Sequence, residues 1–101
     1  MKDPSPYITV THNAAERRFE AIVDGQLCRA DYRLVDAVMR MVHTEVPYRL
    51  EGRGIAGRLV AAAVEHARTN GLRLAPQCSY VRAWMRRHPE AHDLLAHGYL
   101  V

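Results

Sequence analysis

Residues 44–60 read Thr44-Glu-Val-Pro-Tyr-Arg-Leu-Glu-Gly-Arg-Gly-Ile-Ala-Gly-Arg-Leu-Val60, and this stretch decides the fold. A β-rich run ends at Pro47, a short turn with Gly52 and Gly54 follows, and a helix then begins. Unpaired N–H groups and the positive end of the dipole make a helix N-terminus an anion site. Glycine in the turn removes the side chain that would keep a phosphate away. The stretch therefore predicts a site for the pyrophosphate of a nucleotide-like cofactor.

The residues after the turn predict a helix, a strand and two more helices. Apolar residues recur at helical spacing over Gly54–Asn70, and Gly71 stands where a C-terminal cap belongs. Leu72–Pro76 is predicted to be a short buried strand, which completes a parallel strand–helix–strand crossover. Two short C-terminal helices are predicted over Ser79–His88 and Pro89–Ala96, the second with proline at its first position.

Three antiparallel strands are predicted before the turn. Tyr7–Thr11 alternates apolar and polar residues, and a turn over residues 12–15 leads into a strand over Arg17–Val23. Asp24-Gly25 is a strong hairpin signal, because both residues tolerate positive φ. The return strand covers Gln26–Arg33, with Cys28, Ala30 and Tyr32 on one face.

A longer strand over Ala37–Val46 is predicted after a short break at Leu34–Asp36. Helix is the competing interpretation for Asp36–His43, since Met and Ala are good helix formers. We prefer strand because Pro47 ends the run. A second reason is that four residues share a parity, as on one face of a strand: Val38, Val42, Thr44 and Val46.

Composition places the chain among folded proteins with one modest core. It has 101 residues, 49% hydrophobic and 25% charged, with a formal net charge of +3. No apolar run approaches the ~20 residues that span a bilayer. Arginine is spread along the chain instead of clustered, so nucleic acid is not the expected partner. Cys28 and Cys78 fit a reducing compartment. We expect a cytoplasmic protein without membrane contact, a monomer or weak homodimer, with a flexible lead-in over residues 1–6 and one compact domain over residues 7–101.

The motif Arg49-x-x-Gly52-x-Gly54, between a strand and a long helix, resembles the acetyl-CoA motif of the GNAT superfamily of N-acetyltransferases. With the run 43–47 and Cys78-x-Tyr80, the chain resembles compact Yjdj-type members over residues 7–95. The resemblance implies an α/β (α+β) fold, in which a mixed, mostly antiparallel sheet of about five strands splays open to admit the pantetheine arm. It implies acetyl-CoA (CoA) as cofactor, held by Val46, Arg49, Gly52, Arg53, Gly54, Ile55 and Ala56.

Cys78 is the first catalytic candidate, since it follows a short strand and directly precedes a helix. A helix N-terminus favours the thiolate form of a cysteine. We expect Cys78 near the acetyl thioester, either as an acyl-accepting nucleophile or as a positioned thiol. The alternative is a buried structural cysteine, which is the role we assign to Cys28.

Proton transfer needs a base for the attacking ammonium and an acid for the departing CoA thiolate. His43 and Glu45 share one face of the strand that leads into the turn, and either has base chemistry. Tyr80 is the candidate acid. The alternatives are a surface carboxylate for Glu45 and core packing for Tyr80. No metal site is expected: His88 and His92 have ligand spacing, but Pro89 interrupts the helix between them.

These expectations define an N-acetyltransferase, hence an acyltransferase, that moves an acetyl group to an amine of a small molecule or a protein. Larger relatives carry helices between their first strands that help form a lid over the acceptor, and this chain has none. The alternative function is therefore a CoA- or acyl-CoA-binding module with little or no transferase activity. The acceptor itself is not encoded in any motif.

Overall fold

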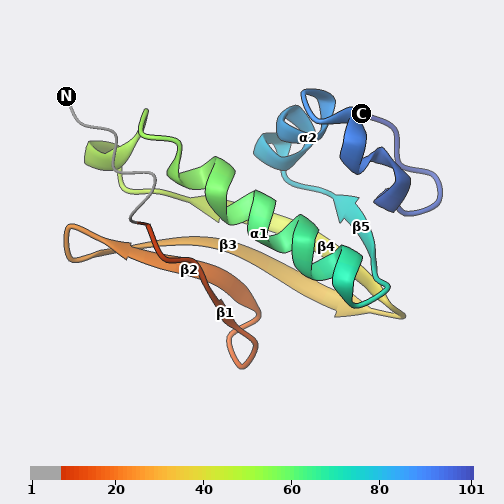
Figure 1. The fold of residues 1–101 in the computed structure, drawn as a ribbon, viewed down its shortest axis with the longest axis horizontal. Coiled ribbons are helices and arrows are strands. Elements are labelled where there is room, and N and C mark those ends of the chain that lie inside the picture. The colour runs from red at the N-terminus through yellow and green to blue at the C-terminus, as the bar shows by residue number, and fades with distance from the viewer. Residues whose placement is uncertain (1–7) are drawn as a thin grey trace.

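The computed structural model describes residues 8–101 and consists of one five-stranded sheet with helices packed against it (Figure 1). The strand order is β1-β2-β3-β4-β5, antiparallel except for the parallel pair β4–β5. Helix α1 connects β4 to β5 and lies along one face of the sheet. The elements are β1 Thr11–Asn13, β2 Arg18–Val23, β3 Gln26–Val35, β4 Val38–Glu45, the 3-10 helix η2 Tyr48–Leu50, α1 Ile55–Thr69, β5 Arg73–Pro76, α2 Ser79–Arg86 and the 3-10 helix η3 Pro89–Leu94. The predicted fold class is confirmed.

Two tight hairpins join β2 to β3 and β3 to β4. Asp24 and Gly25 have φ of 51° and 75°, as the hairpin prediction requires. Asp36 and Ala37 have φ of 51° and 63°, and Val35 pairs with Val38. The break predicted at Leu34–Asp36 is therefore wrong, because β3 runs through Val35 before a two-residue turn that no glycine signals.

Strand β1 starts later than predicted. His12 and Asn13 pair with β2 instead of turning, and the turn begins at Ala14. His12 belongs to the ladder because its ring stacks on Phe19 with centroids 4.4 Å apart. Of the predicted strand Tyr7–Thr11, only Thr11 is in β1; residues 8–10 precede it, and Tyr7 lies outside the described residues, as do residues 1–6.

A β-bulge in β4 changes which side chains face the core. Asp31 pairs with His43 and Tyr32 with Met41, so Val42 is an extra residue on β4. A bulge of this kind shifts the alternation of side chains by one. Met39 and Met41 are fully buried before it, whereas Thr44 turns toward α1 after it. The strand prediction is confirmed, but the bulge interrupts the single alternation that the shared parity of Val38–Val46 assumed.

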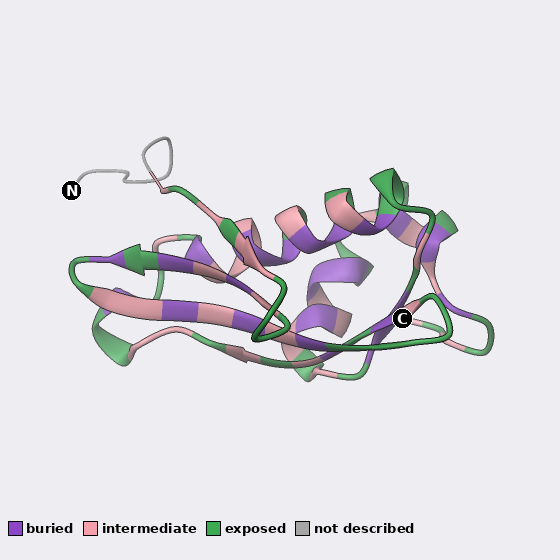
Figure 2. Cartoon of the chain, turned by 90° about the horizontal axis from the view of Figure 1, so that it is seen from below, coloured by how far each residue is buried: buried purple, intermediate pink, exposed green. Residues whose placement is uncertain are grey.

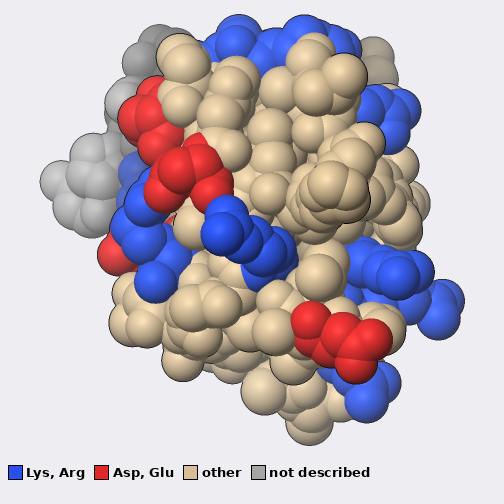
Figure 3. All heavy atoms as spheres, turned by 90° about the vertical axis from the view of Figure 1, so that its right-hand side faces the viewer, with Lys and Arg blue, Asp and Glu red and all other residues tan. Residues whose placement is uncertain are grey.

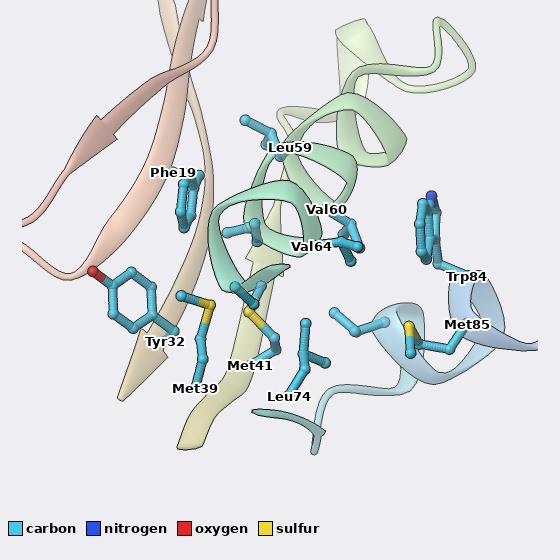
Figure 4. Packing of buried hydrophobic residues seen from close by; sticks show 14 of the residues in the cluster. Phe19, Tyr32, Met39, Met41, Leu59, Val60, Val64, Leu74, Trp84 and Met85 are labelled. Atoms are coloured by element: carbon cyan, nitrogen blue, oxygen red, sulfur yellow. The ribbon is translucent and has the colours of Figure 1, made fainter. Parts of the chain in front are cut away.

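The core lies between the sheet and the apolar stripe of α1 (Figures 2 and 4). Residues on that stripe, including Leu59, Val60 and Ala63, are fully buried against β2, β3 and β4. Burial of each large side chain stabilises the fold by about 1.5–3 kcal/mol. Gly54 and Asn70 flank α1 as its caps, so the predicted helix is confirmed.

Helix α2 packs against the N-terminal part of α1 through Val81, Trp84 and Met85. A Cβ at Gly57 would lie 3.5 Å from the Tyr80 hydroxyl, which shows how closely the two helices approach. The last predicted helix is a 3-10 helix over Pro89–Leu94 and not an α-helix. None of the helices in residues 8–101 combines the length and apolar character that crossing a bilayer requires.

Two C-terminal histidines bond to backbone carbonyls. His88 Nδ1 lies 2.8 Å from the Trp84 oxygen, and His92 Nε2 lies 2.6 Å from the Met85 oxygen. Each ring therefore donates an N–H to a carbonyl near the end of α2, which fixes the segment that follows the helix.

Candidate functional site

Strands β4 and β5 diverge at the bulge. Their parallel pairing ends at Met41 and Pro76. The Met41 oxygen accepts hydrogen bonds from the N–H groups of both Gln77, at 3.0 Å, and Cys78, at 2.9 Å. The edge of β4 beyond Met41, up to Glu45, therefore has no strand of residues 8–101 beside it on this side. This divergence is the splay that the resemblance implied.

A pocket of about 470 Å³ opens beside the divergent end of β4. Three parts of the chain form its wall: the end of β4, the glycine turn with the first turn of α1, and the start of α2. The lining residues are Thr44, Glu45, Val46, Leu50, Glu51, Gly52, Gly54, Ile55, Ala56 and Tyr80. Residues 44–60 thus provide the whole wall except for Tyr80.

The glycine turn presents backbone to this pocket. Gly52 and Gly54 have φ of 84° and 79°, a left-handed conformation that other residues adopt at a cost. A Cβ at either position would meet nothing within 4 Å, so both face open space. The first α-helical bond runs from Arg58 N–H to the Gly54 oxygen at 3.2 Å. The N–H groups of residues 55–57 precede it and have no partner within the helix, which suits a phosphate.

The two arginines expected to add charge stand outside the pocket wall. Arg49 is exposed at the end of η2. The Arg53 guanidinium forms an ion pair with Asp24 of the β2–β3 turn, with Nη2 and Oδ2 3.3 Å apart. The pocket wall at this turn is therefore formed without either guanidinium group.

Leu50 and Thr44 are wall residues that sequence reasoning did not select. Leu50 is 1% exposed and anchors η2 in the core, which fixes the path of the chain into the glycine turn. The sequence feature that could have identified this anchor is a single leucine between the charged residues Arg49 and Glu51. Thr44 turns inward only because the bulge precedes it, and no sequence pattern marked that change.

His43 and Glu45 lie together on the face of the sheet opposite α1. His43 Nε2 is 3.0 Å from Glu45 Oε1, and Arg29 Nη2 from the neighbouring strand is 3.0 Å from the same oxygen. Both side chains of the His43–Glu45 pair are more than half exposed. The hydrogen bond with His43, and then the charge of Arg29, lower the pKa of Glu45.

The ionised carboxylate sets the proton arrangement of this pair. A carboxylate can only accept, so Nε2–H of His43 donates to it and Nδ1 of a neutral ring keeps its lone pair. Arg29 was not foreseen, since only the β3–β4 register, which sets it opposite Glu45, reveals the contact. Of this pair, Glu45 lines the pocket and His43 does not.

Cys78 and Tyr80 approach the pocket from α2. Cys78 is the N-cap residue of α2 and is half-buried, with Sγ 3.6 Å from Thr44 Oγ1. It contacts a residue of the pocket wall without lining the pocket itself, whereas Tyr80 lines it. Cys28 is free and fully buried, and burial raises the pKa of its thiol.

The splayed sheet and its glycine-lined pocket define an α+β domain with an open pocket at the end of β4. A family model described as GCN5-related N-acetyl-transferase matches residues 18–94. Protein NATD1 of Xenopus tropicalis is 33% identical over 90 residues, covering 86% of this chain and 83% of that protein. Protein NATD1 of Homo sapiens is 33% identical over 89 residues, covering 81% of this chain and 75% of that protein.

A solved structure extends the similarity to the whole fold. The solution NMR structure of a GCN5-like putative N-acetyltransferase from Staphylococcus aureus superposes with a TM-score of 0.70 and 28% identity, covering 98% of this chain and 97% of that one. The chain belongs to the GCN5-related N-acetyltransferase family, the GNAT superfamily that its motifs resembled.

Proposed function

We propose that this protein binds acetyl-CoA in the pocket beside the end of β4 and transfers the acetyl group to an amine. The observation that carries the proposal is the pocket itself, about 470 Å³ and walled by the glycine turn and the first turn of α1. Family membership supports the same activity. The backbone N–H groups of residues 55–57 would hold the pyrophosphate, and the free edge of β4 at Thr44–Val46 would meet the pantetheine amides.

The bound cofactor supplies a thioester whose carbonyl carbon forms a C–N bond with the amine as the C–S bond breaks. Before that, the ammonium of the acceptor must lose a proton. His43 Nδ1 takes this proton, while Glu45 accepts the Nε2–H bond and stabilises the imidazolium that forms. Tyr80, in the pocket wall, donates a proton to the departing thiolate, and its phenolate recovers the second proton that the nitrogen loses as the amide forms. General acid–base catalysis of this kind contributes about 10²–10⁴-fold in rate.

Cys78 is placed near the thioester in this proposal. Its contact with Thr44, 3.6 Å from sulfur to oxygen, supports that position. Thr44 lines the pocket and Cys78 does not, which favours a positioned thiol over an acyl-accepting nucleophile.

A second candidate function is a CoA-binding module with little or no transfer. The observation that favours it is the tight turn between β1 and β2, where the Arg17 N–H donates to the Ala14 oxygen at 3.2 Å. No helix covers the acceptor side at that point in residues 8–101. Both candidates share the cofactor pocket and differ only in what happens to the acetyl group.

The acceptor is proposed to be a small molecule or a protein amine. On the side shown in Figure 3, arginines lie in separate groups with acidic side chains between them. A continuous basic surface would be expected for a nucleic-acid partner. A cytoplasmic location and a monomeric or weakly dimeric state stay predictions.

Calorimetric titration with CoA and acetyl-CoA tests the shared step. We expect saturable binding of both by protein whose circular dichroism shows it folded, and no heat at millimolar cofactor would overturn the proposal. Thiol release from acetyl-CoA with a panel of amines then separates the candidates. Amine-dependent release supports the transferase, and binding without release across the panel supports the module.

A further inference from the structure

A second pocket, of about 420 Å³, lies where the β1–β2 turn meets the middle of β3 and the bulge of β4. Three arginines and two carboxylate residues are among its lining, which consists of Glu16, Arg17, Arg18, Asp31, Tyr32, Arg33 and Val42. It shares no lining residue with the cofactor pocket. The function proposed above leaves this pocket without a role.

Positive charge in this pocket is incompletely neutralised. Arg18 is paired with Glu20, with Nε and Oε1 2.6 Å apart. Neither Arg17 nor Arg33 has a carboxylate oxygen within 4.0 Å in the described part of the chain. Their guanidinium groups are therefore available to an anion, which arginine binds through two parallel hydrogen bonds.

A cross-strand pair of arginines adds positive charge beside this pocket. Arg33 of β3 stands directly opposite Arg40 of β4 in the ladder, so the two side chains leave the sheet on the same face. Both are exposed, and Arg40, which lies beside the pocket lining and not in it, also lacks a carboxylate within 4.0 Å among residues 8–101. Like charges directly opposite each other destabilise a sheet. An anion between them would remove that cost.

Backbone geometry fixes the turn against this pocket. Arg17 has φ of 55°, in the left-handed region where glycine or asparagine is easier to place. Its carbonyl oxygen accepts the Tyr32 N–H at 3.0 Å, which ties the turn to β3. A strained residue beside a bulge is the kind of feature that clusters at binding sites.

A chain of ion pairs joins this pocket to the cofactor pocket. Asp31, which lines the second pocket, lies 3.4 Å from Arg29 Nε, and Arg29 pairs with Glu45 at 3.0 Å. Side chains on one face of a strand repeat every second residue, so Arg33 stands about 13 Å along β3 from Arg29. The face opposite α1 thus has Glu45 at the cofactor end, Asp31 between the two pockets, and Arg33 with Arg40 at the other end.

We propose that the arginine pocket binds a carboxylate or phosphate group of the acceptor while the acceptor amine lies beside Glu45. The acceptor is then an elongated amine with an anionic group about 13 Å from the nitrogen, the span of about four extended residues. A peptide with a free N-terminus and a downstream acidic group has this shape. The position assigned to the amine rests on the proposed acetyl transfer. Anion binding by the arginine pocket does not depend on that transfer.

Anion binding is tested first without cofactor, by NMR titration of the full chain with inorganic phosphate and, separately, acetate. We expect saturable shifts of the side-chain Nε–H signals of Arg17, Arg33 and Arg40, with the larger shift identifying the preferred anion. The signal of Arg86, an exposed arginine at the end of α2, serves as the reference. Absence of shifts with both anions, or equal shifts at Arg86, overturns the pocket.

The double variant Arg33→Gln with Arg40→Gln tests the same site by substitution. It should lose the phosphate or acetate shifts at Arg17, and its melting temperature should stay equal or rise, because a repulsive pair is removed. Arg86→Gln is the matched control and should keep them. Unchanged shifts in the double variant overturn the pocket.

Steady-state kinetics with acetyl-CoA tests the acceptor class. With four-residue peptides that differ only in a terminal carboxylate, phosphoserine or amide, the double variant should raise KM at least tenfold for the acidic peptides, leaving kcat for the amide unchanged. Equal effects on all three peptides overturn the acceptor assignment. If anions still shift the NMR signals of these arginines but the protein fails to bind acetyl-CoA, the proposed function is overturned and the anion pocket is not.

Discussion

The two pockets lie on one sheet but are built from different parts of the chain. The cofactor pocket is mostly backbone, formed by two glycines with positive φ, the first turn of α1 and the free edge of β4. The second pocket is mostly side chain, formed by charged residues that the β1–β2 turn and the registers of β2, β3 and β4 bring together. A backbone site fails when a glycine is replaced and tolerates other changes. A side-chain site behaves in the opposite way.

The largest expected effect is the loss of cofactor binding in Gly54→Val. The new side chain would enter the space that faces the pocket, and a β-branched residue is strained at φ of 79°. We expect acetyl-CoA affinity to fall by at least about 100-fold, measured by calorimetry.

Gly98→Val is the matched control for strain. Gly98 also has positive φ, 88°, a Cβ added there would meet nothing within 4 Å, and the residue lies outside the pocket wall. It should keep wild-type affinity. Equal losses in the two variants would show that strain, and not access to the turn, causes the defect.

Glu45→Gln should give the next largest effect, on rate and not on affinity. The amide can donate to His43, so the ring is no longer held with its lone pair on Nδ1. We expect kcat to fall by about 100-fold with acetyl-CoA affinity unchanged. The double variant Glu45→Gln with His43→Gln should have a kcat only slightly below that of Glu45→Gln alone, since the two residues act as a unit. A wild-type kcat in Glu45→Gln would remove this pair from the proposed mechanism.

Cys78→Ala should have a smaller effect. The thiol contacts Thr44 and not the pocket, so its removal should leave acetyl-CoA affinity unchanged and lower transfer by about tenfold through loss of positioning. Cys28→Ala is the comparison, because Cys28 is fully buried in the core. It should lower the free energy of unfolding and leave the rate per folded molecule intact. If Cys78→Ala does the same, Cys78 is a structural residue.

The smallest effect concerns pH, on the face that α1 covers. Burial, and then the charge of His66, lower the pKa of His12, so the unfolded chain takes up this proton at a higher pH than the folded one. The contribution of neutral His12 to stability is therefore complete above its ordinary value of 6.5 and falls as pH decreases through the folded value. The carboxylates with lowered pKa values, such as Glu20, titrate below this window.

Urea unfolding between about pH 7.5 and 5.5 measures this dependence. His12→Phe keeps the stack on Phe19 but removes the titrating ring, so its stability should vary less with pH in this window. An unchanged slope would assign the dependence to another group.

The glycine turn was predictable because local sequence specifies it. Gly52, Gly54 and the apolar spacing of α1 act within a few residues, and the strand–turn–helix followed from them. The Asp24-Gly25 hairpin was predictable for the same reason. By contrast, Asp36-Ala37 forms an equally tight turn without glycine, and no local signal marks it.

The face opposite α1 was only partly predictable. His43 and Glu45 share a face by simple alternation, and they do contact each other. Arg29 reaches Glu45 through cross-strand register, which depends on both hairpins and on the bulge together. The shared parity of Val38–Val46 did not reveal the bulge for the same reason, and one extra residue at Val42 exchanges the two faces.

That extra residue makes β4 two short segments with separate tasks. Before Val42, Met39 and Met41 serve the core; after it, the alternation restarts and sets Thr44 and Glu45 in the pocket wall. Substitutions that improve packing in the first segment need not reorient the second. A protein of this size can therefore vary its stability and its chemistry independently along a single strand.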